Sequence, residues 1–343
     1  MDSKQRFINA CLNKEVDRPP VWMMRQAGRY LPEYRAVKEK HGTKEMMQTP
    51  EIACEITIQP VDIIGTDAAI LYSDILMIPD AMGMGLRFSP GEGPVFDFLI
   101  NTEDALNKLN TQHLNERLSY VFQSIALCLK KLPEDYPLLG FAGAPFTVAC
   151  YMMSGGHAKD FAQVKKLAWT EPKIFHGLME ILTTATIDYV LEQGNGGVTA
   201  IQIFDSWAGV LSKEDYAVMA KPYTERVFKA LKDNYIPSIH YIKGSEHLLE
   251  ELKTLPSDVI SIDWRTSLGK AKQIVGSDFA LQGNIDPDVL LSNPELIKER
   301  IATMMQSIGN PKKGYIANLG HGIGKDTPVA NAKAFIDGVK NYF

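Results

Sequence analysis

Eight short apolar runs, spaced along almost the whole chain, most strongly constrain how this sequence can fold. Each run is rich in strand-forming residues and ends in polar residues or glycine. Strands that read as continuous apolar runs are buried on both faces, which is typical of a parallel sheet covered by helices. The predicted strands are Val21–Met24, Ala68–Tyr72, Leu138–Ala142, Thr199–Phe204, Pro237–Ile242, Val259–Ile262, Phe279–Gln282 and Tyr315–Asn318.

Helical patterns fill most of the intervals between these runs. Repeated strand–helix units with no obvious linker predict an α/β fold, a (β/α)8 TIM barrel that forms a single domain over residues 1–343. A doubly wound open sheet is the alternative, but it would ordinarily carry a Gly-rich nucleotide loop after the first strand, and Arg25–Arg29 is not one. The sequence Pro-Gly-Glu-Gly within Leu86–Leu99 predicts a β-hairpin inserted after strand two. The clearest helical patterns are Pro50–Ile64, Lys173–Glu192, Lys213–Lys232, Glu246–Thr254 and Pro294–Ile308.

The amino-acid composition limits the kinds of molecule that this protein can bind. With 343 residues, 45% of them hydrophobic, the chain can bury a large core. Its net charge of −5 and the lack of a Lys/Arg run argue against a nucleic-acid face, so a polyanionic ligand needs a local basic cluster. We find no signal-peptide pattern and no apolar stretch of membrane-spanning length, and we expect a soluble cytoplasmic protein. Four cysteines without Cys-x-x-Cys spacing are expected to be buried free thiols: Cys11, Cys54, Cys128 and Cys150.

Two arginines directly follow the first predicted strand. Arg25 and Arg29 lie four residues apart, and Gly28 between them permits a close approach of the backbone to a ligand. Because guanidinium groups bind carboxylates and phosphates bidentately, the pattern predicts an anion site. The structural alternative is that both arginines form surface ion pairs with Glu33 or Asp17.

Polar residues follow the other predicted strands as well, and in a barrel catalytic groups gather at the carboxyl ends of strands. Asp74 is the sharpest candidate because apolar residues flank it on both sides, so that its carboxylate is desolvated. A structural cap or a buried partner for an arginine is the alternative role. The other candidates are Ser73, Gly143, Tyr151, Asp205, Ser206, Lys243, Asp263, Trp264, Asn284, Asp286, Asn318 and His321.

Two familiar motifs fail on inspection. The run Gly320–Lys325 resembles a phosphate loop, but Leu319 and Asp326 stand where a Walker A loop needs Gly and Ser or Thr. The seven histidines form no His-x-His or His-Glu-x-x-His pattern, and no cysteine lies within two or three residues of a histidine. We therefore expect neither a nucleotide site nor a zinc site.

The segment Pro20–Tyr34 closely resembles the first signature of the uroporphyrinogen decarboxylase family, and Gly140–Tyr151 resembles a second. The order and spacing of both blocks fit that family, and the resemblance extends over essentially the whole chain. It implies cofactor-free decarboxylation of the four acetate side chains of uroporphyrinogen III, which gives coproporphyrinogen III and CO2 in haem biosynthesis. It also implies a homodimer, whereas the expected lack of a metal and of a nucleic-acid or membrane partner rests on the residue patterns and composition above.

The resemblance further implies roles for individual residues. Asp74 is expected to receive the pyrrole N–H groups and to act in catalysis with Arg25 and Arg29. Met24 is expected to line the cleft, and Ser154 departs from the family pattern, in which an acidic residue or alanine is usual. The residues expected to bind substrate are Arg25, Gln26, Arg29, Asp74, Phe141, Tyr151, Ser206 and His321.

Three functions from other classes remain open at this point. A related barrel methyltransferase would act on corrinoid or thiol substrates and would typically carry a His-x-Cys zinc pattern, which this chain lacks. A Schiff-base aldolase would use Lys243 at the end of strand five. A non-catalytic tetrapyrrole carrier would need no catalytic residue, although an intact Asp74 and arginine pair argue against loss of activity.

Overall fold

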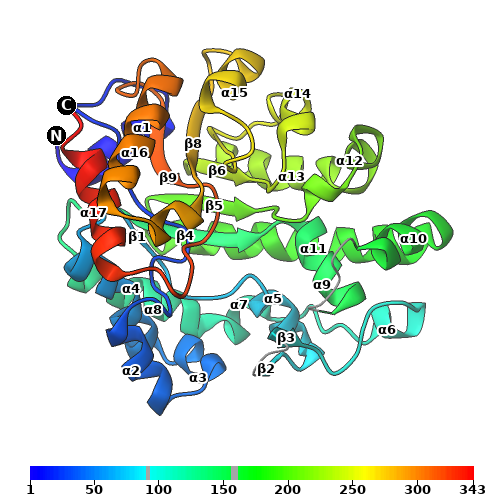
Figure 1. Cartoon of the computed structure of the whole chain (residues 1–343). Coiled ribbons are helices and arrows are strands. Elements are labelled where there is room, and N and C mark those ends of the chain that lie inside the picture. Colours follow the sequence, from blue (N-terminus) through cyan, green and yellow to red (C-terminus); the bar gives the residue numbers. More distant parts are fainter. Residues whose placement is uncertain (90–92, 156–160) are drawn as a thin grey trace.

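The computed structural model describes residues 1–89, 93–155 and 161–343. Seven parallel strands form one curled sheet in the order β1-β4-β5-β6-β7-β8-β9, and helices wrap around it (Figure 1). The architecture is the predicted α/β, TIM-barrel-like one. The strands are β1 (Ala69–Ile70), β4 (Leu138–Gly143), β5 (Ala200–Phe204), β6 (Ser238–Tyr241), β7 (Val259–Ser261), β8 (Ala280–Ile285) and β9 (Tyr315–Leu319).

Helix α4 (Pro50–Ile64) follows the segment 21–24, one further helix follows each of the seven strands, and all eight pack on the outer face of the sheet. These outer helices are α4 (Pro50–Ile64), α8 (Ser119–Lys131), α11 (Pro172–Asn195), α13 (Lys221–Asp233), α14 (Leu249–Leu252), α15 (Leu268–Val275), α16 (Pro294–Ile308) and α17 (Val329–Lys340). The ring closes where α17 contacts α4. Further helices are α1 (Ser3–Cys11), α2 (Pro32–Lys40), α3 (Thr43–Gln48), α5 (Met77–Pro79), α6 (Glu103–Asn107), α7 (Leu114–Arg117), α9 (Pro145–Ser154), α10 (Ala162–Thr170) and α12 (Lys213–Met219), with single turns at Asp80–Met84, Ala208–Val210, Glu246–Leu248 and Pro287–Leu291.

The first predicted strand, Val21–Met24, closes the barrel without forming a regular strand. Ala317 of β9 exchanges backbone hydrogen bonds with this segment, donating to Pro20 O at 2.9 Å and accepting from Trp22 N at 3.3 Å. On the other side, Asp67 N donates to Val21 O at 2.8 Å, just before β1 begins. The segment therefore lies between the two edge strands of the sheet and bonds to both.

Side chains complete the pairing of this segment where backbone partners are missing. The Gln26 side chain accepts from Met23 N at 3.1 Å and donates to Ala68 O at 2.9 Å. Asn318 Oδ1 accepts from Met24 N at 3.0 Å. Because these amides take the places of ladder groups, the chain can turn out of the sheet immediately after Met24 and still leave no buried backbone donor unpaired there.

Two apolar clusters make up the core. The inner cluster fills the barrel with side chains such as Trp22, Tyr241 and Ile316, and Phe7 and Ala10 of α1 belong to it. Helix α1 thus covers the amino-terminal end of the barrel, opposite the carboxyl ends of the strands. The outer, larger cluster lies between the sheet and the surrounding helices. All four cysteines are free and buried, as predicted.

Two predicted helices are shorter or more divided than expected. The pattern over Lys213–Lys232 was expected to be one helix, but it forms α12 and α13, separated at Ala220. Pro222 has no N–H to bond to the preceding turn, so a continuous helix cannot pass through it. The range Glu246–Thr254 forms a 3₁₀ turn followed by the single turn of α14.

A small antiparallel pair, β2 (Arg87–Ser89) and β3 (Gly93–Val95), lies within the range where the sequence predicts a hairpin. The predicted turn residues 90–92 fall outside the described residues. In Figure 1 this pair lies near α3 and α5, and α3 contacts β2. The pair therefore stands close to the carboxyl-end face of the barrel.

Helix α11 corrects one expectation, that no stretch reaches membrane-spanning length. Its 24 residues are long and apolar enough to cross a membrane by length and composition. Half of its most apolar window is buried inside the protein, where α11 packs on α9, α13 and β4. Such burial is typical of a core helix, whose apolar side chains contact the sheet and the neighbouring helices.

Candidate active site

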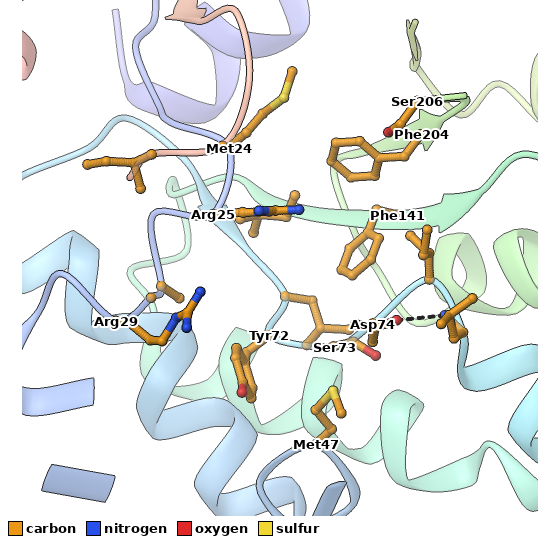
Figure 2. Close-up of a pocket in the computed structure, with 18 of the residues that line it drawn as sticks. Met24, Arg25, Arg29, Met47, Tyr72, Ser73, Asp74, Phe141, Phe204 and Ser206 are labelled. Carbon is orange, nitrogen blue, oxygen red and sulfur yellow. Dashed lines mark hydrogen bonds between the residues drawn. The ribbon is translucent and has the colours of Figure 1, made fainter. Parts of the chain in front are cut away.

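A cleft of about 470 Å³ opens at the carboxyl ends of the strands. Its walls come from the segment after Met24, the segment after β1, the helix α9 and the chain beyond β9. Figure 2 shows Arg25 and Arg29 on one side of this space, Tyr72, Ser73 and Asp74 on another, and Phe141 of β4 and Phe204 of β5 on a third. The cleft lies where a barrel places its reactive groups.

Arg25 and Arg29 both project into open space at the cleft and are exposed. Across the described ranges, neither guanidinium lies within ion-pair distance of a carboxylate. Asp17 instead pairs with Arg6, at 2.7 Å between Arg6 Nε and Asp17 Oδ1. The predicted alternative of surface ion pairs is therefore wrong, and both positive charges remain available to an anionic ligand.

The backbone at Arg25 adopts a conformation that non-glycine residues rarely take, with φ of +62°. Two glycines make room for it. A Cβ on Gly28 would lie 2.7 Å from the Arg25 carbonyl oxygen, and a Cβ on Gly322 would collide with the Arg25 side-chain carbons. Neighbouring glycines thus permit a strained backbone that turns the Arg25 side chain into the cleft.

Asp74 follows β1 and carries a carboxylate without a cationic partner in direct contact. Its Oδ1 accepts one hydrogen bond, from Leu76 N at 2.9 Å, drawn as the dashed line in Figure 2. Burial raises the pKa of the Asp74 carboxyl, and the bond from Leu76 and the charge of Arg25 offset part of that rise. A carboxylate held in this way gains free energy from any N–H donor or cation that enters the cleft.

His321 is neutral in the cleft. Its Nδ1 accepts a hydrogen bond from Gly322 N at 2.7 Å, which leaves the ring proton on Nε2. Burial lowers the pKa of His321 to about 3, and the charges of Arg25, Lys243 and Arg265 act in the same direction. The ring is therefore a neutral hydrogen-bond donor near neutral pH.

Aromatic rings line the deeper part of the cleft. Phe141 and Phe204 meet edge to face with ring centroids 5.7 Å apart. The ring centroids of Tyr151 on α9 and Trp207 are 6.2 Å apart, and burial raises the pKa of Tyr151. Ser206 follows β5 and faces the same space. Such walls suit a flat or domed hydrocarbon ring system whose polar groups lie at its rim and centre.

The structure brings seven of the predicted binding residues together around the cleft, and Met24 lines it as well. They are Arg25, Arg29, Asp74, Phe141, Tyr151, Ser206 and His321. Gln26 is placed elsewhere: its side chain is 0% exposed and both ends of its amide bond to backbone groups. Its position supports a role in holding the loop of Arg25, and not contact with a ligand.

Several other strand-end residues have structural partners away from the cleft. Asp205 is buried and accepts a bond from Thr147 Oγ1 at 2.8 Å, and Thr147 in turn accepts from Trp207 N. Asp263 pairs with Arg265. Asn284 donates to backbone carbonyls of the loop after β7, Asn318 accepts from Met24 N, and Asp286 caps the turn at Pro287–Leu291.

Cleft residues that the sequence reasoning missed come mostly from outside the barrel strands. Tyr34 belongs to α2, Met47 to α3, Pro94 to β3 and Lys325 to the loop after β9. Tyr72 stands two residues before Asp74 but inside the predicted strand. The strand-end rule carries no signal for residues on additional helices, because their distance from the barrel is set by packing alone.

Three kinds of comparison describe the relatives of this chain. Residues 2–342 match the family described as Uroporphyrinogen decarboxylase (URO-D). The chain is 45% identical over 327 residues to a uroporphyrinogen decarboxylase of Geotalea daltonii, and the aligned residues make up 95% of each protein. It is 44% identical over 328 residues to that of Geobacter sulfurreducens, again over 95% of both.

Among solved structures, a methyltransferase from Methanosarcina mazei is similar with a TM-score of 0.85, 20% sequence identity, and coverage of 100% of this chain and 99% of that one. At 20% identity, the similarity between this chain and that methyltransferase shows a shared fold only. A putative B12-independent methionine synthase from Listeria monocytogenes is similar with a TM-score of 0.58 and 10% identity, over 97% of this chain and 98% of that one. The sequence relatives, in contrast, share nearly half of the residues.

Proposed function

The chain belongs to the uroporphyrinogen decarboxylase family and is a decarboxylase of tetrapyrrole biosynthesis, and we propose that its cleft removes the four acetate carboxyl groups of uroporphyrinogen III to give coproporphyrinogen III and CO2. The observation that supports this site is the arrangement of a carboxylate without an ion-pair partner, Asp74, opposite two exposed guanidiniums, Arg25 and Arg29. A ring with central N–H groups and peripheral carboxylates is complementary to that arrangement.

The substrate supplies its own electron sink. A proton adds to the α-carbon of the pyrrole, next to the β-carbon that bears the acetate, which makes the ring an iminium-like cation. The bond between the acetate methylene and its carboxylate then breaks, CO2 leaves, and the electron pair of that bond neutralises the ring. A second proton adds to the resulting exocyclic methylene as the α-carbon gives up its own, so that each acetate consumes one proton and becomes a methyl group.

Asp74 is proposed to stabilise the cationic ring. The pyrrole N–H groups would donate to its carboxylate, which is already in place and loses little on reorganisation when positive charge develops. Its raised pKa reflects burial without sufficient compensation, and bound N–H donors supply that compensation. The carboxylate therefore interacts more strongly with the transition state than with the neutral ring.

The remaining cleft residues are proposed to hold the rim of the substrate. Arg25 and Arg29 would bind peripheral carboxylates, and His321 would donate from Nε2 to another. Tyr151 and Ser206 would supply neutral hydrogen bonds, while Phe141 packs against the ring. Because arginine has a very high pKa and His321 is neutral, neither is assigned the proton that starts the reaction.

We also propose that the whole chain acts as one barrel domain, that it forms a homodimer with the two clefts facing each other, and that it works in the cytoplasm without a nucleic-acid or membrane partner. The family match over residues 2–342 supports the single domain. The net charge of −5 argues against general attraction to polyanions such as nucleic acids. Sedimentation analysis tests the dimer directly.

An anaerobic assay with uroporphyrinogen III, followed by separation of the porphyrin products by carboxylate number, tests the reaction. The wild-type protein is expected to give products with seven, six, five and finally four carboxylates. Arg25→Ala and Arg29→Ala should each lose at least about tenfold in kcat/KM, since a charge-assisted bond contributes about 1.5–3 kcal/mol. Arg→Lys should restore little, because an ammonium does not replace a bidentate guanidinium.

Arg300→Ala on the exposed surface of α16 is the matched control and should behave as the wild type. Full activity of a folded Arg29→Ala protein would show that this arginine has no part in substrate binding. No formation of coproporphyrinogen by the wild-type protein would overturn the assigned reaction itself.

A further inference from the structure

Two tyrosines of the cleft wall form a hydroxyl pair to which the roles above give no function. Tyr34 on α2 and Tyr72 after β1 both line the cleft, and their hydroxyl oxygens are 2.9 Å apart. Their rings meet edge to face with centroids 5.7 Å apart. The pair bridges the additional helix α2 and the segment that leads from β1 to Asp74.

The positions of both rings are firmly determined. Tyr72 N donates to Thr57 Oγ1 at 2.9 Å, and that hydroxyl donates to Ala53 O within α4. Tyr34 is only 6% exposed and lies in the first turns of α2. A pair held from both sides presents its hydroxyl groups in a fixed direction, which is a property of ligand-positioning groups.

One proton of the pair has no acceptor. Two hydroxyl groups carry two protons, and the bond between the oxygens uses one of them. Within residues 1–89, 93–155 and 161–343, no other side chain or backbone group hydrogen-bonds either hydroxyl. A half-buried hydroxyl donor without an acceptor is unfavourable until a ligand or solvent accepts from it.

The surroundings select the kind of acceptor. Burial raises the pKa of both tyrosines. The charge of Asp74 raises the pKa of Tyr72 further, and the charge of Arg29 offsets part of the rise for Tyr34. Both tyrosines are therefore neutral donors, one beside the carboxylate that faces the ring centre and one beside a free guanidinium. The positive charge of Arg29 near Tyr34 favours an anionic oxygen at the rim of the substrate as the acceptor.

We propose that the Tyr34–Tyr72 hydroxyl pair is a carboxylate-binding subsite, which binds one peripheral carboxylate of the tetrapyrrole by donating its unused O–H. The inference deepens the proposed function and rests on it. The subsite differs from Arg25 and Arg29 because it holds a carboxylate without placing a positive charge on it. The carboxylate is either an acetate or a propionate, since both radiate from the same ring.

The test removes the hydroxyl groups and keeps the rings. Tyr34→Phe, Tyr72→Phe and the double variant are compared with Tyr223→Phe, which loses a hydroxyl bond to His176 outside the cleft. The double variant is expected to raise KM for uroporphyrinogen about tenfold and to change kcat less than about twofold, because a contact made equally in ground and transition states affects KM alone. The control should match the wild type in both constants.

A second measurement identifies the carboxylate. Anaerobic equilibrium dialysis gives the affinity for coproporphyrinogen, which keeps the propionates and lacks the acetates. An affinity reduced about tenfold in the double variant assigns a propionate to the pair, and an unchanged affinity together with a raised KM for uroporphyrinogen assigns an acetate.

Unchanged KM and unchanged product affinity in the folded double variant would overturn the proposal. If the unfolding temperature of that variant nevertheless fell, the hydroxyl pair would serve only to hold α2. If the double variant does not fold, Tyr72→Phe alone decides in the same way. Failure of the wild-type protein to act on uroporphyrinogen would contradict the proposed function, and this outcome is distinct from a variant that equals an active wild type.

Discussion

Opposite charges are kept apart at the level of single residues. Arg25 and Arg29 have no carboxylate partner in the described chain, and Asp74 has no cation in direct contact. An ion pair between them would neutralise both and leave little for a ligand to gain. Separation therefore stores binding free energy for a molecule that carries donors at its centre and carboxylates at its rim.

The charge of Asp74 is expected to be needed for turnover more than its shape. Turnover should fall in the order Asp, Glu, then Asn and Ala, with Asp74→Asn reduced about 100-fold or more because a fixed electrostatic contact is lost. Asp74→Ala should also lose binding of coproporphyrinogen. Single-turnover kinetics and anaerobic dialysis measure the two effects, and wild-type turnover in Asp74→Asn would rule out electrostatic stabilisation by this carboxylate.

The same substitution has a second, opposite consequence for stability. Burial raises the pKa of Asp74 in the folded protein, so the folded state binds this proton more tightly than the unfolded state and stability falls as pH rises through the raised pKa. Asn does not titrate, so urea unfolding at neutral pH should show Asp74→Asn to be more stable than the wild type. Asp188→Asn is the control, because burial also raises the pKa of Asp188. This residue lies on α11 outside the cleft, so the turnover of the Asp188→Asn protein should equal that of the wild type.

His321→Asn is expected to keep measurable activity, because a neutral amide donor replaces a neutral ring donor. Its pH dependence has a definite sign. The folded pKa of His321 is lowered to about 3, so the unfolded state takes up the proton first as pH falls below about 6.5. The wild type should lose stability relative to His321→Asn between about pH 6.5 and pH 3, by at most about 1.4 kcal/mol per pH unit.

Urea midpoints at several pH values measure this difference. A constant difference between the two proteins across that range would show that His321 is not a buried neutral ring. Complete loss of activity in a folded His321→Asn protein would instead assign the starting proton transfer to His321.

At the level of elements, the segment that closes the barrel also carries the arginines. Residues 20–24 are bonded on both sides, and the chain then leaves the sheet through the strained residue Arg25. The side chains of Gln26 and Asn318 hold this departure in place. The position of Arg25 is therefore a consequence of how the barrel is closed.

Gln26→Leu should destabilise the protein and reduce activity although Gln26 does not line the cleft. Leucine fills a similar volume but leaves Met23 N and Ala68 O without their side-chain partner, each at a cost of about 1–3 kcal/mol. Urea unfolding should show a loss of about 2–5 kcal/mol. Gln306→Leu on the exposed face of α16 is the matched control and should change stability little; an equal effect of both would show that the Gln26 bonds do not hold the segment.

At the level of the whole molecule, a chain with net charge −5 holds a cleft in which cations face the solvent. The overall field does not attract polyanions, so recognition depends on local geometry. The described residues contain no group of three His, Cys, Asp or Glu side chains that could hold a metal ion.

Dialysis against a chelator is therefore expected to leave the rate of decarboxylation unchanged, and added metals or organic cofactors should not raise it. The anaerobic product assay before and after dialysis provides the measurement. A rate that falls with chelator and returns with one specific metal would refute cofactor-free catalysis.

The sequence by itself determined the alternation of strands and helices, the barrel class, and the motif residues Arg25, Arg29 and Asp74. Local chemistry suffices there, because buried strands must be apolar and the groups at their carboxyl ends must share one face. Two helices, α4 and α16, have the predicted bounds Pro50–Ile64 and Pro294–Ile308. Each begins with proline in its first turn and has a strong apolar stripe, which are local signals.

Only the tertiary structure decided that Val21–Met24 closes the barrel through backbone and side-chain bonds, that Gln26 supports the loop from behind, and that Tyr34 faces Tyr72 across the cleft wall. These relations join residues that are 38 or more positions apart or depend on the direction of a single side chain. Neither composition nor periodicity encodes such pairings, because they arise when the sheet closes and the additional helix α2 packs against its carboxyl-end face.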